Sequence, residues 1–347
     1  MGLNLPRRPS LAPAGESRPQ IRLGVTVPNR RLIMTGAAAA TLSACAPRGK
    51  AGFGRLRIGY QKNGLLLLAQ AGGRLPGRLA SAGVTGIDWA QFGSGPPMLE
   101  AMRAGAIDIG AVGDTPPIFA QAAGSPITYA AAQSLTGAGE GLLVKADSSF
   151  HAVGDLKGRR IAFTKGSSAH LFIVKVLTTA GLALGDITPV YLSPADASAA
   201  FSNGAVDGWA IWDPYFAIAL QAGARLLIDG GSVAPTNNFY IASSSFAQRA
   251  PGVLNSLLDA LVAEAAWSNA HEANAVTAIH AATGLPNAVV NVSLQREPFA
   301  VVPMTDSVVR TQQDNADLFG RLGIIPSSVD VRAASWTHWA PAPTSNT

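Results

Sequence analysis

The sequence has little cysteine, little charge and few aromatic residues. Cys45 is the single cysteine among 347 residues, so the chain forms no intrachain disulfide, and the part that follows has no thiolate metal cage or catalytic thiol. Charged residues make up 14% of the chain and aromatic residues 7%, whereas 48% are hydrophobic. This balance is typical of a folded chain with a buried core and excludes a charge-rich disordered protein.

The positive charge is concentrated near the start of the chain. Residues 1–44 contain one acid, Glu16, so of the 26 basic and 21 acidic residues, 20 of each follow. The six basic residues of this segment are Arg7, Arg8, Arg18, Arg22, Arg30 and Arg31. The body is therefore neutral by formal count. Nucleic-acid binding depends on clustered Lys and Arg, so this balance argues against a nucleic-acid partner.

Long apolar runs are also missing: no segment approaches the 18 or more residues that a membrane-spanning helix needs. The apolar run in "NRRLIMTGAAAATLSAC" (29–45) is shorter and ends at small residues before Cys45. This stretch resembles a bacterial lipoprotein signal, with Leu42–Cys45 as its lipobox. The resemblance predicts that residues 1–44 are a cleaved export signal, that Cys45 carries the lipid, and that 45–54 form a linker. Arg30 and Arg31 leave twin-arginine export open as an alternative.

The rest of the chain alternates strand-like and helix-like segments. Residues 55–60, 86–92 and 107–113 read as strands, and 65–75 and 96–105 as helices. The same alternation restarts in "DLKGRRIAFTKGSSAHLFIVKVLTTAGL" and continues to "GWAIWDPYFAIAL", whereas the chain becomes mainly helical from about residue 251. Such alternation predicts an α/β fold in which helices cover parallel sheets.

Two extended segments lie between these α/β units, "ITYAAAQSL" (127–135) and "NNFYIASS" (237–244). If the chain leaves one lobe at the first and returns at the second, two hinge strands join the lobes. We therefore expect a first lobe from 55–134 and 238–347, the latter with the C-terminal helices, and a second lobe from 135–237. A ligand would lie in the cleft, where the carboxyl ends of strands meet the amino ends of helices.

Two segments have the composition of helix starts at strand ends. In "GDTPP" Thr115 is a preferred N-cap and Pro116 falls at the first helical position; in "TKGSSAH" Ser167 and Ser168 precede a second helix. The free amides of a helix start attract anions. We expect these two starts, one from each lobe, to hold one oxyanion between neutral donors.

Several segments together resemble the aliphatic-sulfonate-binding proteins of ABC importers, within the nitrate, sulfonate and taurine binding group. The segments are "RIGYQKNG", "GDTPPIFAQAAG", "DLKGRRIAFTKGSSAH", "PADASAAFSNGAVDGWAIWDPY" and "NNFYIAS". The resemblance covers residues 55–250 well and the remainder loosely. It implies a periplasmic-binding-protein type II fold that captures an organosulfonate and delivers it to a membrane permease and, through it, an ATPase. It also implies a monomer without a cofactor, placed in the periplasm or at the cell surface.

Candidate ligand-binding residues lie at the expected cleft. Gln61 follows the first strand and offers an amide donor, Trp212 offers a flat apolar face, and Asp213 either stabilises the hinge or recognises an amino group. The oxyanion donors expected at the two helix starts are Thr115, Ser167 and Ser168, and His170 lies one turn further along. Glu140 shares the two roles open to Asp213. Lys62, Arg160 and Lys165 are expected to be solvated surface charges.

Two alternatives remain open at this point. Taurine, nitrate or a thiamine-precursor pyrimidine could replace the alkanesulfonate; taurine would need a carboxylate such as Asp213 or Glu140 for its ammonium group. A desulfinase or lyase could also use this fold. Against an enzyme, the sequence has no G-x-S-x-G, H-E-x-x-H or G-x-x-x-x-G-K-[ST] motif, and its histidines lack metal-binding spacing. We therefore expect no catalytic residue and no metal.

Overall fold

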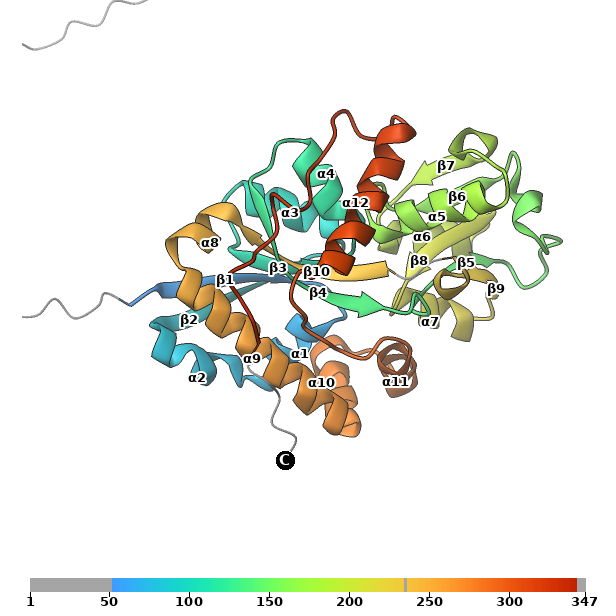
Figure 1. Ribbon diagram of the computed structural model, residues 1–347. Helices are drawn as coiled ribbons and strands as arrows, with labels where there is room; N and C mark the ends of the chain where they lie inside the picture. Colours follow the sequence, from blue (N-terminus) through green and yellow to red (C-terminus); the bar gives the residue numbers. More distant parts are fainter. Residues whose placement is uncertain (1–51, 234–235, 342–347) are drawn as a thin grey trace, which may run out of the picture. The chain divides into compact units, whose positions relative to one another are not determined.

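The computed structural model describes residues 52–233 and 236–341 (Figure 1). The predicted export signal, the predicted lipidation at Cys45 and most of the predicted linker lie outside this range. Within it, two five-stranded sheets form the centres of two α/β lobes. No helix of the described residues is long and apolar enough to cross a membrane.

The first lobe is built on a mixed sheet. Its strands lie in the order β2 (Val84–Gln91), β1 (Gly54–Tyr60), β3 (Ile109–Val112), β10 (Thr236–Ser243) and β4 (Ile127–Leu135). The first three strands are parallel, as the alternation of segments predicts, whereas β10 runs antiparallel to both of its neighbours. The parallel part brings the carboxyl ends of β1 and β3 to one edge of the sheet.

Helices cover both faces of this sheet. On one face lie α1 (Leu65–Gly72), α2 (Leu75–Leu79), α8 (Ser244–Arg249), α9 (Pro251–Ala270) and α10 (Glu272–Thr283). On the other lie α3 (Gly95–Arg103) and α12 (Asp306–Arg321). The side chains of β10 alternate between these layers, with Tyr240 and Ala242 in one core and Phe239 and Ile241 in the other. The first lobe also contains α4 (Thr115–Ala122), α11 (Asn287–Arg296) and the short η1 (Ala80–Ala82).

The second lobe repeats this arrangement with fewer helices. Its strands lie in the order β7 (Thr188–Tyr191), β6 (Arg160–Phe163), β8 (Gly208–Trp212), β5 (Glu140–Val144) and β9 (Arg225–Asp229). Strands β7, β6 and β8 are parallel, and β5 is antiparallel to β8 and β9. Its remaining elements are α5 (Ser168–Thr179), α6 (Pro194–Ser202), α7 (Tyr215–Gln221), η2 (Val153–Leu156), η3 (Leu184–Asp186) and η4 (Gly230–Ser232).

The chain passes between the two sheets twice. It leaves the first sheet at the end of β4 and enters the second at β5, and it returns from β9 to β10. The two crossings touch at Gly137 and Gly230, where a Cβ on Gly137 would lie 2.7 Å from the carbonyl carbon of Gly230. Gly137 also has φ +85°, a conformation that favours glycine. The two lobes are thus joined by two closely packed hinge segments, one after β4 and one before β10, whereas the two extended segments expected at the hinge are neighbouring strands of the first sheet.

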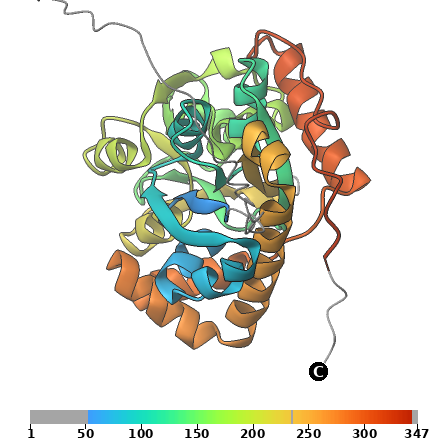
Figure 2. The same cartoon turned by 90° about the vertical axis from the view of Figure 1, so that its left-hand side faces the viewer.

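An apolar contact also joins the lobes away from these crossings. Ile118 of α4 and Phe319 of α12 pack with Leu171 and Val174 of α5, all of them buried. Figure 2 shows α12, in red, on the side of the molecule away from the α10 and α11 pair, in orange. The two lobes therefore contact each other at two places, the hinge crossings and this apolar cluster.

Candidate ligand-binding cleft

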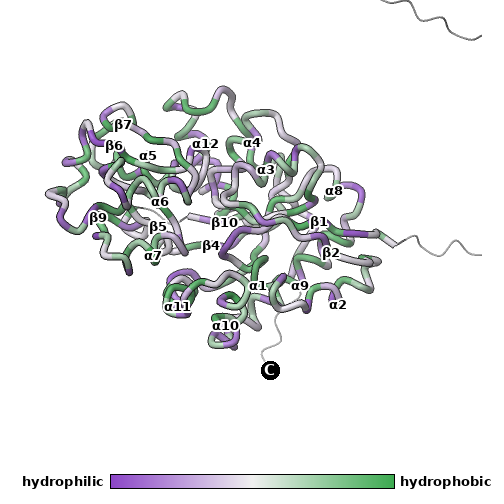
Figure 3. Tube along the Cα trace, turned by 180° about the vertical axis from the view of Figure 1, so that it is seen from behind, coloured by the Kyte–Doolittle hydropathy of each residue, from purple (hydrophilic) through white to green (hydrophobic). Residues whose placement is uncertain are grey.

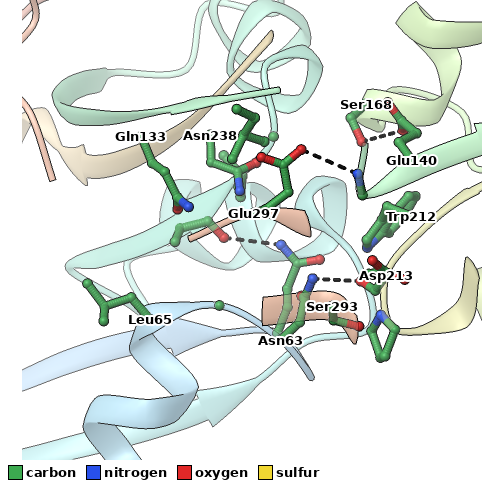
Figure 4. Close-up of a pocket in the computed structure, with 18 of the residues that line it drawn as sticks. Asn63, Leu65, Gln133, Glu140, Ser168, Trp212, Asp213, Asn238, Ser293 and Glu297 are labelled. Carbon is green, nitrogen blue, oxygen red and sulfur yellow. Dashed lines mark hydrogen bonds between the residues drawn. The ribbon is translucent and has the colours of Figure 1, made fainter. Parts of the chain in front are cut away.

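A cavity of about 140 Å³ lies between the lobes. Its wall combines strand ends of both sheets, the first turn of α5, and residues of α1, α10 and α11. Figure 4 shows Ser168 and Glu140 at one end of this cavity and Leu65 at the opposite end. The C-terminal helices thus complete a site that the two sheets begin.

The start of α5 supplies hydroxyl and amide groups at the polar end. Ser167 is the N-cap residue, with φ −92° and ψ 173°, and its hydroxyl donates to the carbonyl of Thr164 over 2.7 Å. Ser168 is the first helical residue, and its hydroxyl donates to Oε1 of Glu140 over 2.9 Å. Both residues line the cavity.

The opposite helix start, that of α4, differs from the prediction. The helix begins at Thr115 itself, Asp114 is the N-cap residue, and Pro116 and Pro117 follow. The hydroxyl of Thr115 donates to Oδ1 of Asp114 over 2.9 Å, and Thr115 is buried outside the cavity wall. Because two prolines remove two of the free N–H groups, this start is a poor anion site. The expectation that Thr115 is the N-cap was wrong, and the structure does not place its hydroxyl in the cleft.

The lobes come close together beside this helix start. A Cβ on Gly113, at the end of β3, would lie 3.0 Å from the Cβ of Ser168 on α5. Gly113, Ser168 and Asn238 all line the cavity, so the approach of the two lobes forms its polar end. A larger side chain at residue 113 would hold the lobes apart.

Glu140, the first residue of β5, is buried in this end of the cavity and only 8% exposed. Burial, followed by the charge of Asp114, raises the pKa of Glu140 to about 8. The hydroxyl of Ser168 and the charge of Lys175 act in the opposite direction, and the charge of Glu297 adds to the rise. Glu140 is therefore mostly neutral at pH 7.

Asp213 lies at the end of β8 beside Trp212, and both line the cavity, as expected. Its carboxylate accepts two hydrogen bonds from Nη1 of Arg296, at 3.0 and 3.1 Å, and one from the backbone N–H of Ala217 at 3.0 Å. Its backbone carbonyl accepts a 2.6 Å bond from Nδ2 of Asn63, in the other lobe. Burial raises the pKa of Asp213, although Arg296 opposes the rise. These bonds tie Asp213 to α11, to the start of α7 and to Asn63 of the first lobe.

Glu297 binds the first hinge crossing. Its carboxylate accepts N–H groups from Thr136 (2.9 Å), Gly137 (2.8 Å) and Gly139 (3.3 Å), together with the hydroxyl of Thr136 at 3.0 Å. The segment that follows α11 therefore contacts the hinge directly, while Arg296 at the end of α11 contacts the second lobe.

Amide side chains line the middle of the cavity. Gln61 lies there as expected, and its Nε2 donates to the carbonyl of Ala111 over 3.1 Å. Nε2 of Gln133 donates to the carbonyl of Pro298 over 2.8 Å. Asn237 and Asn238 of β10 also belong to the wall. These uncharged groups suit a polar ligand without adding positive charge.

The far end of the cavity is apolar. Leu65 begins the four-leucine run of α1, which is green in the hydropathy view of Figure 3. The other apolar residues of this end are Ile279, Leu285, Val290, Leu294 and Phe299, contributed by α10, α11 and the segments beside them. The cavity therefore changes from polar to apolar along its length, which suits an amphipathic ligand.

His170 lies away from the cavity wall, contrary to its assignment to the site. It is 1% exposed and stacks on Phe163, with ring centroids 5.2 Å apart, and it also lies near Phe119 and Phe319 of the first lobe. Its Nδ1 accepts the N–H of Gly166 over 3.2 Å, so the proton of the neutral ring is on Nε2. Burial, helped by the charge of Lys165, lowers the pKa of His170 to about 4. His170 thus belongs to the apolar contact between the lobes.

The sequence prediction missed several cavity residues. Lys62, expected to be a surface charge, is exposed at the cavity wall, whereas Arg160 pairs with Asp207 on the surface. Other residues that the prediction missed include Asn63, Leu65, Gln133, Asn237, Asn238, Ser293, Leu294 and Glu297. "QKNG" and "NNFYIAS" contain three of these and were part of the family resemblance. For the residues of α11 no local motif exists.

No group of three or more potential metal ligands occurs among residues 52–233 and 236–341. The carboxyl groups of the cavity are engaged by Ser168, by Arg296 and by the hinge backbone. The carboxyl groups of the cavity therefore already have partners, and its wall offers mainly hydrogen-bond donors and apolar surface.

Comparisons with known proteins place the chain in a family. Residues 56–283 match the model of the NMT1-like family. The chain is also 39% identical, over 81% of its length and 88% of the relative, to a protein of Escherichia coli K12 named a putative aliphatic sulfonates-binding protein. The chain belongs to the aliphatic-sulfonate-binding group of the NMT1-like family.

Two further members of the aliphatic-sulfonate-binding group support this placement. A Bacillus subtilis protein with the same name is 31% identical over 87% of this chain and 92% of its own. The solved structure of an alkanesulfonate-binding protein from Xanthomonas axonopodis pv. citri, bound to MOPS, is 40% identical and has a TM-score of 0.78. It covers 82% of this chain and 98% of its own. This similarity extends to the periplasmic-binding-protein fold with its two lobes.

Proposed function

We propose that this protein is an extracytoplasmic solute-binding protein that captures an aliphatic sulfonate between its lobes and delivers it to an ABC permease. The observation that carries the proposal is the polarity of the interlobe cavity, with hydroxyl and amide donors at one end and leucine, isoleucine and valine side chains at the other. A sulfonate group offers only acceptors, and its alkyl chain is apolar. The names of the relatives and the sulfonate bound in the Xanthomonas structure support the same ligand class.

In this proposal the sulfonate lies at the start of α5, beside Ser167 and Ser168, where the free helix amides donate to its oxygens. Trp212 packs on the first carbons, and Gln61 contributes an amide in the middle of the cavity. The organic part extends toward Leu65 and Leu294. Asp213 holds α11 through Arg296 and does not contact the anion. Because the ligand touches both lobes, it favours the closed arrangement.

The export route and the anchor are part of the proposal. Cleavage before Cys45 and lipidation of its sulfur would hold the protein at the outer face of the membrane as a monomer. The relatives with periplasmic roles support the compartment. Palmitate labelling of the wild-type protein and of Cys45→Ala tests the anchor: we expect labelled, membrane-bound wild type and unlabelled, soluble variant. Equal labelling, or none in either, would contradict it.

A ligand panel tests the function. Thermal shift and titration calorimetry would compare methane-, butane- and octanesulfonate with taurine, nitrate, sulfate and phosphate in a sulfonate-free buffer. We expect micromolar binding of the alkanesulfonates, about −8 kcal/mol, and a rise of the apparent melting temperature, because a ligand of the native state stabilises it. Failure of all alkanesulfonates to bind, or their turnover by the isolated protein, would overturn the proposal.

Taurine is the second candidate, because the carboxyl group of Glu140 lines the cavity and could accept a hydrogen bond from an ammonium group. Tighter binding of taurine than of ethanesulfonate, which has the same length of carbon chain, would favour it. We place taurine second because Glu140 is adjacent to the expected sulfonate donors rather than at the far end of the cavity.

A further inference from the structure

We propose that Glu140 binds the sulfonate group as a neutral carboxylic acid and donates its proton in a hydrogen bond to a sulfonate oxygen. This inference rests on the proposed function and makes sulfonate capture dependent on the protonation of one side chain. It assigns to Glu140 a role in selecting fully ionised, acceptor-only anions.

The position of Glu140 is the first argument. It is the first residue of β5, directly after the hinge crossing, and it faces the start of α5. Its Oε1 accepts the hydroxyl of Ser168 over 2.9 Å, and the residue lines the cavity while being almost fully buried. A proton on Oε2 is therefore available to a group in the cavity. Figure 4 shows Glu140 and Ser168 together at the polar end.

The second argument is the contrast with the other two acids of the cavity wall. Asp213 is paired with Arg296 and accepts the N–H of Ala217, and Glu297 accepts three N–H groups of the hinge crossing. Within the described part of the chain, Glu140 receives only the hydroxyl of Ser168. Two of the three acids have the partners that a carboxylate needs, and Glu140 does not.

Two of the charged groups near Glu140 also raise its pKa, and one lowers it. Asp114, at the start of α4, and Glu297, after α11, both favour its neutral form, whereas Lys175 of α5 favours the ionised form. Asp213 faces the cavity with its charge matched by Arg296, and Lys62 lies at the exposed wall. With burial as the largest cause, the pKa of Glu140 is about 8 in the ligand-free protein. Below this pH the acid already holds the proton that it would donate.

The consequence concerns the ligand. A sulfonate has three acceptor oxygens and no proton, so an ionised Glu140 would repel it and a neutral one would bind it. Above a pH of about 8, binding would take up one proton from solution, and the dissociation constant would rise about tenfold for each pH unit. No bond is made or broken beyond this transfer from solvent to Glu140.

Titration calorimetry with butanesulfonate tests the proposal, since this ligand stays ionised throughout the range. The wild type, Glu140→Gln, Glu140→Leu and the control Glu297→Gln would be titrated between about pH 6 and 9.5. Phosphate, Tris and bicine serve as buffers because sulfonate buffers would compete for the site. Comparing their different ionisation enthalpies gives the number of protons taken up.

We expect wild-type affinity to be constant up to about pH 7.5 and to fall above pH 8, with proton uptake approaching one. Glu140→Gln keeps a donor and should show a flat profile, binding about 30-fold more tightly than wild type at pH 9.5. Glu140→Leu should bind at least tenfold more weakly than wild type at pH 7. Glu297→Gln removes a charge that adds to the rise of the Glu140 pKa, so it should weaken binding and move the fall in affinity to lower pH, yet keep the pH dependence that Glu140→Gln loses.

Three results would overturn the assignment. If wild-type affinity stays flat up to pH 9.5, a protonated Glu140 does not take part in binding, although the sulfonate-binding function could still hold. Loss of butanesulfonate binding in Glu140→Gln at pH 7, or a preference of the wild type for taurine that this variant loses, would indicate an ionised Glu140. If butanesulfonate binds to none of the proteins, the proposed function fails as well.

Discussion

The two ends of the cavity differ in how the fold builds them. The polar end consists mainly of the first residues of α5, the end of β8 and the start of β5 of the second lobe, which Gly113 and Asn238 of the first lobe approach. The apolar end consists of α1 and the α10–α11 pair, which belong to the first lobe and lie far apart in the chain. Under the proposed function this difference separates two tasks: strand and helix ends would bind the charged group, and packed helices would set the space for the rest of the ligand.

This comparison predicts that a change at the polar end affects every ligand equally. Ser168→Asp places a carboxylate where the sulfonate should lie, and at about 4 Å the repulsion would weaken binding roughly 100- to 1000-fold. Titrations with methane- and octanesulfonate should give the same factor. Ser168→Ala is the control and should cost less than tenfold, because it removes one hydroxyl and adds no charge. An unchanged affinity in Ser168→Asp would show that the ligand does not bind at the start of α5.

The next effect tests whether the two ends are independent. Arg296 is on α11 of the apolar end, yet it pairs with Asp213 of the polar end at 3.0 Å. Arg296→Met would leave Asp213 buried without its cation and lower the free energy of unfolding by roughly 2–3 kcal/mol, measured by urea denaturation. Adding Asp213→Asn should restore most of this loss, since no uncompensated charge remains. A single Arg296 variant as stable as wild type would show that α11 is held by other contacts.

These residues also show what the sequence could and could not predict. Ser167, Ser168, Trp212 and Asp213 line the cavity and could be placed there because each lies at or soon after the end of a recognisable strand, and the ends of parallel strands meet at one edge. The two-lobe fold followed from the repeated alternation of strands and helices in the same way. Each of these signals is local, so it can be seen without knowing the packing.

The remaining residues have no local signal. Leu294 and Glu297 line the cavity, and Arg296 pairs with Asp213 of its wall. All three lie on or after an ordinary helix, and only the path of α10 and α11 over the cleft brings them there. Thr115 and His170 failed for a related reason. Composition favoured Thr115 as N-cap, but the helix begins one residue earlier than this prediction, and the neighbours of His170 come from α4 and α12.

A smaller effect should distinguish the apolar end by ligand length. Leu294→Ala removes apolar contact from the far end, so we expect about tenfold weaker binding of octanesulfonate, near 1.4 kcal/mol, and less than a twofold change for methanesulfonate. Leu322→Ala, at an exposed leucine outside the cavity wall, is the matched control and should change neither. Equal losses for both ligands would mean that the alkyl chain does not reach α11.

The smallest effect on binding concerns the helix that the polar end shares with the apolar contact between the lobes. Ser168 and His170 are two residues apart on α5, but Ser168 lines the cavity and His170 is packed among aromatic rings.

Burial holds the pKa of His170 at about 4, below its ordinary value of 6.5, so its neutral form stabilises the fold fully above pH 6.5. As the pH falls toward 4, the unfolded chain takes up a proton that the folded chain refuses, and this stability is lost. His170→Leu cannot take up that proton. Between pH 7 and 5 its melting temperature should therefore fall about 3 °C less than that of wild type, for roughly 2 kcal/mol. Its preference for octane- over methanesulfonate should match wild type, because the substitution is outside the cavity; a changed preference would place His170 in the site after all.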